Sequence, residues 1–269
     1  MFNPATMPSN SPDVLFARTE SFTLANGQQV LSSSVSPLLQ QLEDACQTGS
    51  PGHVGEILRQ ITPLPSDIPM TGHVALQKCL STAVTHQRRD VVRAMLQNGF
   101  LRPNVSEIGI KTAFQARDTS TLQIFIDCGW DVNETGEGMR PLLRHAVNDA
   151  TLRSFLLAKG ASPNVENNRG ITPLETAAQS SPVEVVRELL DHGGDPSKDD
   201  SLIMAAESGR IDVAELLVQK GANVNALMKD LPLPYGQRTR MTALDAATSN
   251  NHLEMVKWLE SHGATARNL

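Results

Sequence analysis

The stretch GITPLETAAQ, residues 170–179, places an acid in a setting that could support chemistry. Glu175 follows Thr172 and Pro173 and precedes a pair of alanines. A carboxyl group held at a fixed place on a helix can act as a general acid or base. The same residues also form a helix start, because Thr172 is a good N-cap and Pro173 suits the first helical position. The acid therefore has a catalytic and a structural interpretation.

Thr-x-x-Glu is the pattern of a capping box. In that motif the Thr172 hydroxyl accepts from the amide of Glu175, and the Glu175 carboxylate accepts from the amide of Thr172. The negative charge also lies near the positive end of the helix dipole. Thr242 and Asp245 repeat the pattern later in the chain. One structural role explains both acids, so we predict that Glu175 stabilises a helix and does not catalyse a reaction.

The other reactive residue types form no recognisable site. The seven histidines make no HxxxH or HExxH pair, and Cys46, Cys79 and Cys128 make no CxxC pair. The chain also lacks GxGxxG, GxxxxGK[ST] and GxSxG motifs. We therefore predict no catalytic residues, no cofactor, no bound metal and no disulfide. Cys46, in DACQTG, is expected to be a small buried residue.

Composition excludes further classes of function. The chain has 269 residues, of which 40% are hydrophobic, and its formal net charge is −6. No run of Lys or Arg supplies a basic face, so we expect no direct binding to nucleic acid. No segment approaches the roughly 18 apolar residues of a membrane span, and the N-terminus does not resemble a secretory signal. We expect a soluble intracellular protein, in the cytoplasm, the nucleus or both.

Six predicted aliphatic helices end in a glycine, at intervals of 30, 31, 33, 28 and 42 residues. These glycines are Gly99, Gly129, Gly160, Gly193, Gly221 and Gly263. Glycine adopts the left-handed conformation that closes a helix without a Cβ penalty. A shorter segment rich in small residues comes before the better preserved of these helices, as in ETAAQ, IMAAESG and LDAATSN. Such a helix pair must stack on its neighbours to bury its apolar stripe.

These units resemble ankyrin repeats, whose pattern is roughly G-x-TPLHxAA, a Gly-bounded turn and then VVxxLLxxGADVN. The match is strong in residues 170–266 and weaker in 40–164. The resemblance implies an all-α solenoid of about seven stacked helix-turn-helix repeats with short β-turn or hairpin fingers. The expected repeats are about 38–63, 71–102, 108–133, 138–164, 167–197, 198–225 and 238–269. We expect residues 1–37 to form a flexible N-terminal arm and residues 226–237 to be an insertion.

The resemblance implies a non-catalytic protein–protein interaction module that acts as an adaptor, scaffold or regulator. Its partner is expected to be another protein, bound through the concave face and the finger loops. A transcriptional co-regulator is one version of this function, and an enzyme with an unrecognised active site on a repeat scaffold is the alternative. We expect a monomer with no membrane partner. The partner-binding positions that the family pattern implies are Asn168, Arg169, Ile171, Gln179, Ser180, Glu207, Ser208, Thr239, Met241, Ser249 and Asn250.

Two other features have open interpretations. The insertion contains the only tyrosine, Tyr235, and is followed by Arg238. Aromatic and Arg residues dominate interface hot spots, so it is either a recognition finger that includes both residues or a tolerated surface loop. Phe100 and Trp130 each follow a closing glycine where the family usually has Ala. They either fill space in shortened repeats or form an exposed apolar patch.

Overall fold

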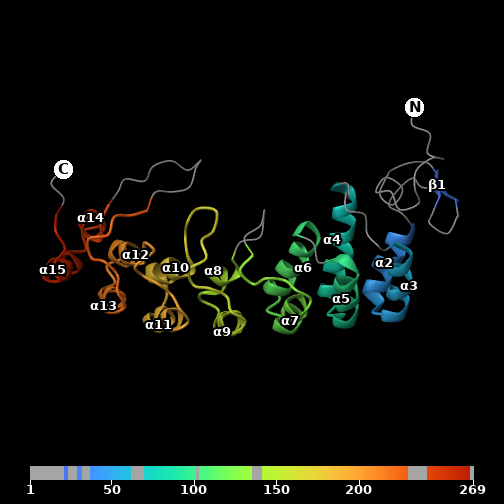
Figure 1. Cartoon of the computed structure of the whole chain (residues 1–269), viewed down its shortest axis with the longest axis horizontal. Helices are drawn as coiled ribbons and strands as arrows, with labels where there is room; N and C mark the ends of the chain where they lie inside the picture. Colours follow the sequence, from blue (N-terminus) through green and yellow to red (C-terminus); the bar gives the residue numbers. More distant parts are fainter. Residues whose placement is uncertain are drawn as a thin grey trace, which may run out of the picture. The chain divides into compact units, whose positions relative to one another are not determined.

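The computed structural model describes residues 21–23, 29–31, 37–61, 70–100, 103–134, 141–229 and 241–266. The chain divides into two compact units, Met1–Asp131 and Val132–Leu269. Within each unit, helices follow one another as antiparallel pairs (Figure 1).

The first unit begins with a short antiparallel hairpin of β1 (Ser21–Thr23) and β2 (Gln29–Leu31). Apart from these strands and Pro37, the predicted N-terminal arm lies outside the described residues. Three described helix pairs follow. They are α2 (Pro37–Thr48) with α3 (Pro51–Ile61), α4 (Met70–Thr85) with α5 (Arg89–Met95) and its continuation η2 (Leu96–Phe100), and α6 (Pro103–Gln115) with α7 (Thr119–Asp127).

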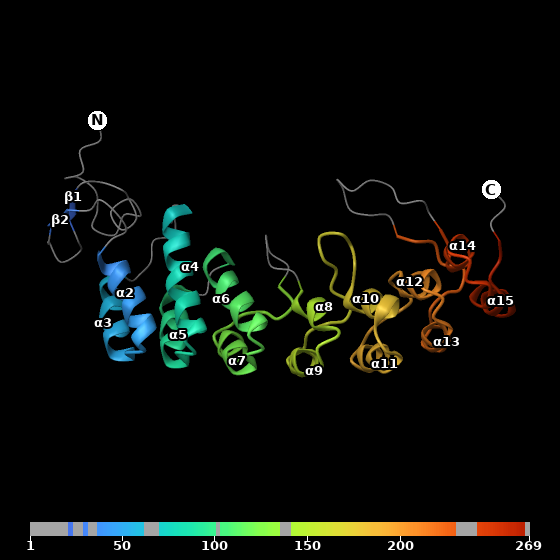
Figure 2. The same cartoon turned by 180° about the vertical axis from the view of Figure 1, so that it is seen from behind.

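The second unit contains four helix pairs among its described residues, which Figure 2 shows from behind. They are α8 (Leu142–Ala146) with α9 (Ala150–Ala158), α10 (Pro173–Ser180) with α11 (Val183–Asp191), α12 (Ser201–Glu207) with α13 (Ile211–Gln219), and α14 (Ala243–Ser249) with α15 (Leu253–Ser261). The described part of the chain therefore holds seven pairs, as the repeat pattern predicts.

Each unit has two layers of helices. The first helices of successive pairs pack on one another, α2 on α4 and α4 on α6 in one unit, and α8 on α10, α10 on α12 and α12 on α14 in the other. Small residues permit this close approach, because the alanine pairs of α10, α12 and α14 are fully buried. These pairs are Ala177–Ala178, Ala205–Ala206 and Ala246–Ala247. The all-α fold of stacked helix-turn-helix repeats is confirmed.

Five of the six predicted glycines close second helices, and the sixth, Gly99, has a positive φ of 93° within η2. Gly160 has φ of 83°, its N–H donates to the Leu157 carbonyl, and the next N–H, of Ala161, donates to the Leu156 carbonyl. This is the Schellman arrangement, which satisfies carbonyls that the helix leaves open. The same two bonds form at Gly129, Gly193, Gly221 and Gly263. The thirty-residue interval in the sequence is therefore the spacing of helix ends.

Neighbouring repeats are joined by polar side chains as well as by apolar packing. The side chain of the residue just before the second helix of a pair contacts backbone carbonyls near the end of the first helix of the preceding pair. The contacts run from Arg88 to Gln47, from Arg210 to Ala177 and Ala178, and from His252 to Glu207. The His252 ring thus has a structural partner in the preceding repeat.

An asparagine four residues after the closing glycine makes a second kind of link. Asn164 donates to the carbonyl of Gly193 at 2.8 Å and accepts from the N–H of Asp195 at 2.9 Å. Asn133 and Asn225 make the equivalent pairs of bonds to later repeats. Ser197 occupies this position after α11, and its hydroxyl bonds locally to Asp195. The connection from α12 to α14 has the Asn225 link, whereas the α10–α12 junction depends on other contacts.

The two conspicuous aromatic residues are buried in the described structure. Phe100 is fully buried, and Trp130 is 5% exposed. The exposed-patch interpretation is therefore wrong, and both rings fill space. Cys46 is also fully buried, and burial raises the pKa of its thiol to about 12. No described helix has the length and apolar character needed to cross a membrane.

Candidate binding groove

A groove of about 460 Å³ opens on the first helices of the second unit. Six of its lining residues come from three helices: Arg144 from α8, Glu175, Thr176 and Gln179 from α10, and Met204 and Glu207 from α12. Ile171, Met228 and Met241 line it from the segments beside the helices. The N–H of Met228 donates to the carbonyl of Met241 at 2.9 Å, so these two residues close the base of the insertion.

The start of α10 positions Glu175 at the groove. Thr172 is the N-cap, Pro173 takes the first helical position, and the Thr172 hydroxyl accepts from the amide of Glu175 at 3.0 Å. This half of the predicted capping box is confirmed. At the start of α14 both halves are present, since the Asp245 carboxylate also accepts from the amide of Thr242 at 2.8 Å.

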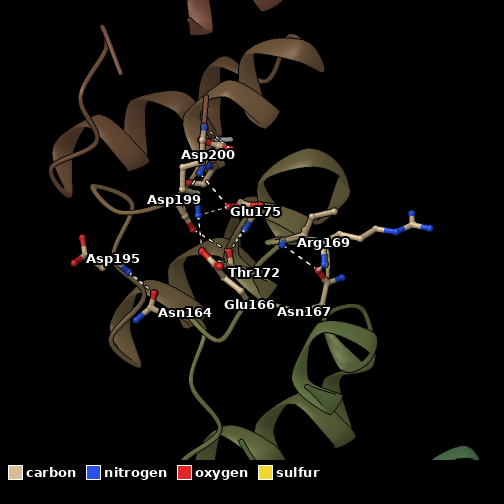
Figure 3. Close-up of polar contacts among 12 residues, drawn as sticks. Asn164, Glu166, Asn167, Arg169, Thr172, Glu175, Asp195, Asp199 and Asp200 are labelled. Carbon is tan, nitrogen blue, oxygen red and sulfur yellow. Dashed lines mark hydrogen bonds and ion pairs between the residues drawn. The ribbon is translucent and has the colours of Figure 1, made fainter. Parts of the chain in front are cut away.

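The other half of the box predicted at Glu175 is wrong. Its carboxylate accepts from the backbone N–H of Asp200 in the next repeat, 3.1 Å away, as Figure 3 shows. The Thr172 hydroxyl also faces that repeat and donates to the Asp199 carboxylate at 3.0 Å. Glu is one methylene longer than Asp, and the buried Asp200 N–H needs an acceptor. The longer side chain therefore links two repeats where Asp245 caps only its own helix.

Burial makes Glu175 an unusual acid. It is 3% exposed, and this burial, helped by the charges of Asp199 and Asp200, raises its pKa to about 7. The Asp200 N–H and the charge of Lys229 act in the opposite direction but do not cancel the effect. Burial also raises the pKa of Asp199. The groove floor therefore contains a carboxyl group that changes charge near neutral pH.

Lys229 ties the base of the insertion to this acid group. Its ammonium lies 2.8 Å from Glu166 and 3.4 Å from Glu175, while its backbone N–H donates to the Asp200 carboxylate at 3.0 Å. Burial on its own lowers the pKa of Lys229, but the bond to Glu166 and the charge of Glu175 outweigh it and raise that pKa. The ammonium is therefore held in its charged form among the carboxylates.

The finger before α10 is shaped by one asparagine. The Asn167 side-chain oxygen accepts from the backbone N–H groups of Arg169 and Ile171, at 2.8 and 3.0 Å, and the backbone N–H of Asn167 donates to the Ile171 carbonyl at 3.1 Å. Gly170, with φ of 69°, allows the turn. The finger places Ile171 at the groove, whereas the Arg169 side chain points away from Glu175 (Figure 3).

The structure gathers some of the sequence-predicted binding residues and not others. The four that line the groove are Ile171, Gln179, Glu207 and Met241. Those that lie elsewhere on the described surface are the exposed Asn168, Arg169, Ser180, Ser249 and Asn250 and the half-buried Ser208. Tyr235, Arg238 and Thr239 lie outside the described residues.

Sequence reasoning did not mark five of the lining residues as binding positions. Thr176 and Met204 stand three positions before Gln179 and Glu207, so the helical period could have placed them on the same face. Glu175 was found but assigned to its own helix only. Arg144 and Met228 carried no such signal, because one lies in a weakly matching repeat and the other at the edge of an insertion.

The Glu175 carboxylate makes two contacts at the groove, with the Asp200 N–H and the Lys229 ammonium, and both join α10 to later parts of the chain. Among the described residues, no three His, Cys, Asp or Glu side chains could hold a metal ion. The lining combines Met and Ile with a few polar and charged groups, as interface surfaces do.

Comparison with known families identifies the repeats. A family described as "Ankyrin repeats (3 copies)" matches residues 110–200 and 146–228. A second, "Ankyrin repeats (many copies)", matches residues 202–260. Together the matches cover more than half of the chain and all four helix pairs of the second unit.

Individual relatives carry similar repeats inside longer proteins. "Ankyrin repeat, SAM and basic leucine zipper domain-containing protein 1" of Ornithorhynchus anatinus is 32% identical over 50% of this chain and 31% of its own length. "Alpha-latrocrustotoxin-Lt1a" of Latrodectus tredecimguttatus is 34% identical over 41% of this chain and 8% of its own. "Ankyrin repeat and KH domain-containing protein mask-1" of Caenorhabditis elegans is 30% identical over 85% of this chain and 10% of its own. The chain thus spans less than a third of each.

Proposed function

The chain belongs to the ankyrin-repeat family, and on that premise we propose that it binds another protein through the groove on its second unit. Ankyrin repeats are typically protein–protein interaction modules. The observation that carries the proposal is the gathering of Ile171, Gln179, Glu207 and Met241 around one groove. The family resemblance marks each of these as a partner-contacting position. In this function the chain acts as an adaptor, scaffold or regulator without chemistry of its own.

The shape and lining of the groove support binding to a segment of a protein. Stacked repeats place finger tips and first helices in register, which gives a continuous surface for a partner chain. A volume of about 460 Å³ is large enough to take side chains from a partner. Exposed polar residues such as Gln179 and Glu207 can fix its orientation by hydrogen bonds.

The charge of the chain favours a protein partner over nucleic acid. The net charge is −6, and no Lys or Arg run offers phosphate contacts. Transcriptional co-regulation is one form that the function can take, because a co-regulator acts by occupying the surface of another protein. Affinity capture of a transcription factor would separate this form from a cytoplasmic adaptor.

The groove is tested by affinity capture of the full chain from cell extract, with mass spectrometry as the readout. Gln179→Arg introduces a bulky cation at an exposed groove position, and the matched control Gln219→Arg makes the same change at the end of α13, away from the groove. We expect the first variant to lose a specific partner that the control retains. Equal recovery of every partner by both folded variants would rule the groove out as the binding surface.

The insertion is tested separately, since Tyr235, Arg238 and Thr239 remain predicted binding residues. Residues 230–239 are replaced by a short Gly-Ser linker, and Met228, Lys229 and Met241 are kept because they line or brace the groove. Loss of a partner from this variant supports the recognition-finger interpretation. Unchanged capture assigns the insertion to the tolerated surface loop.

A further inference from the structure

Three methionine side chains make up most of the apolar lining of the groove. Met228 is 6% exposed, and Met204 and Met241 are half-buried beside it. They come from three different segments, with Ile171 as a fourth apolar group. An unbranched thioether side chain is polarisable and adapts its rotamers, so it packs well along an aliphatic stem. The walls therefore fit a long flexible side chain better than a flat ring.

The groove is lined by one buried acid and one exposed acid. Glu175 is 3% exposed and lies at its floor, and Glu207, at the end of α12, is exposed on its lining. Arg144 is the cation of the lining. The charges of Asp199 and Asp200 also act on Glu175. The Lys229 ammonium forms ion pairs with Glu166 and Glu175.

The charges around the groove are unevenly matched. Two acids, Glu175 and Glu207, and one cation, Arg144, line the groove. Beyond the lining, the charges of Asp199 and Asp200 act on Glu175, and the Lys229 ammonium contacts Glu166 and Glu175. Burial and neighbouring acids keep the pKa of Glu175 near 7 although Lys229 is close. A further positive charge placed in the groove would therefore be attracted, and one negative charge would be repelled.

We propose, resting on the proposed function, that the groove receives a lysine or arginine side chain projected by an extended segment of the partner protein. The aliphatic stem packs against Met204, Met228 and Met241, and the cationic end lies at Glu175 and Glu207. Lys229 supplies the geometric precedent, because its ammonium already approaches Glu175 to 3.4 Å from the side of the insertion. A partner with an acidic or purely apolar side chain at this point binds more weakly.

Protonation of Glu175 is linked to this binding. A cation beside the carboxyl group favours its charged form, so it lowers the pKa from about 7. Binding must then be tighter above that pH than below it. The groups that face Glu175 are Asp199, Asp200 and Lys229, with Arg144 and Glu207 on the same groove.

The test uses the full chain with ¹³C-labelled methionine methyl groups, assigned by single Met→Leu variants. The probes are N-acetyl-lysine methylamide and its neutral counterpart, N-acetyl-norleucine methylamide. We expect the lysine probe to shift the methyl signals of Met204, Met228 and Met241 and to bind at least about tenfold more tightly than the norleucine probe at about pH 8. The lysine affinity should fall at about pH 6 and with added salt.

Two variants locate the charge. Glu207→Gln removes an exposed groove acid, and the control Glu215→Gln removes an exposed acid from α13, outside the groove lining. We expect lysine binding to weaken severalfold in the first and not in the second. Glu175→Gln should weaken binding and abolish its dependence on pH between about 6 and 8. Folding is checked for each variant by its thermal transition.

Other outcomes overturn the inference. Equal or tighter binding of the norleucine probe would make the groove an apolar site, and preference for N-acetyl-aspartate methylamide would assign it to Arg144. Lysine binding that appears only after residues 230–239 are replaced would assign the groove to the chain's own insertion. If the lysine probe fails to bind while Gln179→Arg still loses a partner, the inference fails and the proposed function stands. If the probe binds but no partner depends on Gln179, the proposed function fails.

Discussion

The Glu175 carboxylate accepts a hydrogen bond from the backbone N–H of Asp200, 3.1 Å away in the following repeat. Asp200 is the N-cap of α12, so the side chain of one repeat supports the first turn of the next. At this junction Ser197 stands where asparagine links the other repeats of the second unit. Glu175 therefore joins two repeats at the place where that link is missing, and it does so with a buried acid.

The first prediction concerns pH. The pKa of Glu175 in the folded chain is about 7, above its ordinary value of 4.5, so the folded state holds this proton more tightly than the unfolded state. The free energy of unfolding that Glu175 contributes must therefore fall as pH rises from about 4.5 to about 7, and stay constant above. Replacing Glu175 with Gln removes this dependence. As pH rises from about 5 to about 8, the free energy of unfolding of the variant should increase by roughly 2–3 kcal/mol relative to that of the wild type.

Urea unfolding of the full chain at several pH values measures the difference in the free energy of unfolding between the wild type and Glu175→Gln. Glu184→Gln, which removes an exposed acid from the first turn of α11, is the matched control for the loss of one carboxyl group. A wild-type minus Glu175→Gln difference that is the same at pH 5 and pH 8 would show that the carboxyl group titrates at its ordinary value.

The second prediction concerns the N-cap of α10. The Thr172 hydroxyl accepts from the amide of Glu175 and donates to the Asp199 carboxylate. Thr172→Ala removes both bonds and should lower the free energy of unfolding by roughly 1–2 kcal/mol. Thr176→Ala is the control, because the Thr176 hydroxyl bonds only to a carbonyl of the same helix turn. Equal thermal midpoints for Thr172→Ala and the wild type would contradict the assigned cap.

The third prediction concerns the asparagine links. Asn164→Ala removes two bonds to the next repeat, to the Gly193 carbonyl and from the Asp195 N–H. We expect a loss of roughly 1–2 kcal/mol in the free energy of unfolding. Asn250 bonds only within α14, through the carbonyl of Ala246, so Asn250→Ala should cost less. Similar losses in both variants, measured by thermal unfolding, would show that the links between repeats add no stability.

Much of the fold could be predicted because each repeat marks its own ends. The closing glycines fix the ends of the second helices, and the alanine pairs identify the first helices as the close-packed layer. The complete capping box at Thr242 and Asp245 follows from four residues in a row. These features depend on local sequence alone, and the local rules decide them.

Features that depend on contacts between repeats were predicted less well. The partner of Glu175 lies 25 residues later in the chain, and no local pattern predicts that its carboxylate will choose the Asp200 N–H over its own N-cap. Lys229 approaches Glu166 over a separation of 63 residues. The groove floor arises from such distant contacts, so Glu175 and Met228 became part of the candidate site only through the structure.

The last prediction separates a shielded ion pair from an exposed one. Arg153 on α9 is 9% exposed, lies 2.8 Å from the Glu188 carboxylate on α11 and donates to the Val147 carbonyl. Arg153→Ala leaves both acceptors without this donor, so we expect a loss of roughly 2–3 kcal/mol in the free energy of unfolding. Lys220 and Asp191 also join neighbouring repeats, but both side chains are exposed, and Lys220→Ala should cost less than about 0.5 kcal/mol. Urea unfolding compares the two variants. Equal losses in the two variants would contradict this prediction, because they would mean that water screens the buried Arg153 as effectively as the exposed Lys220.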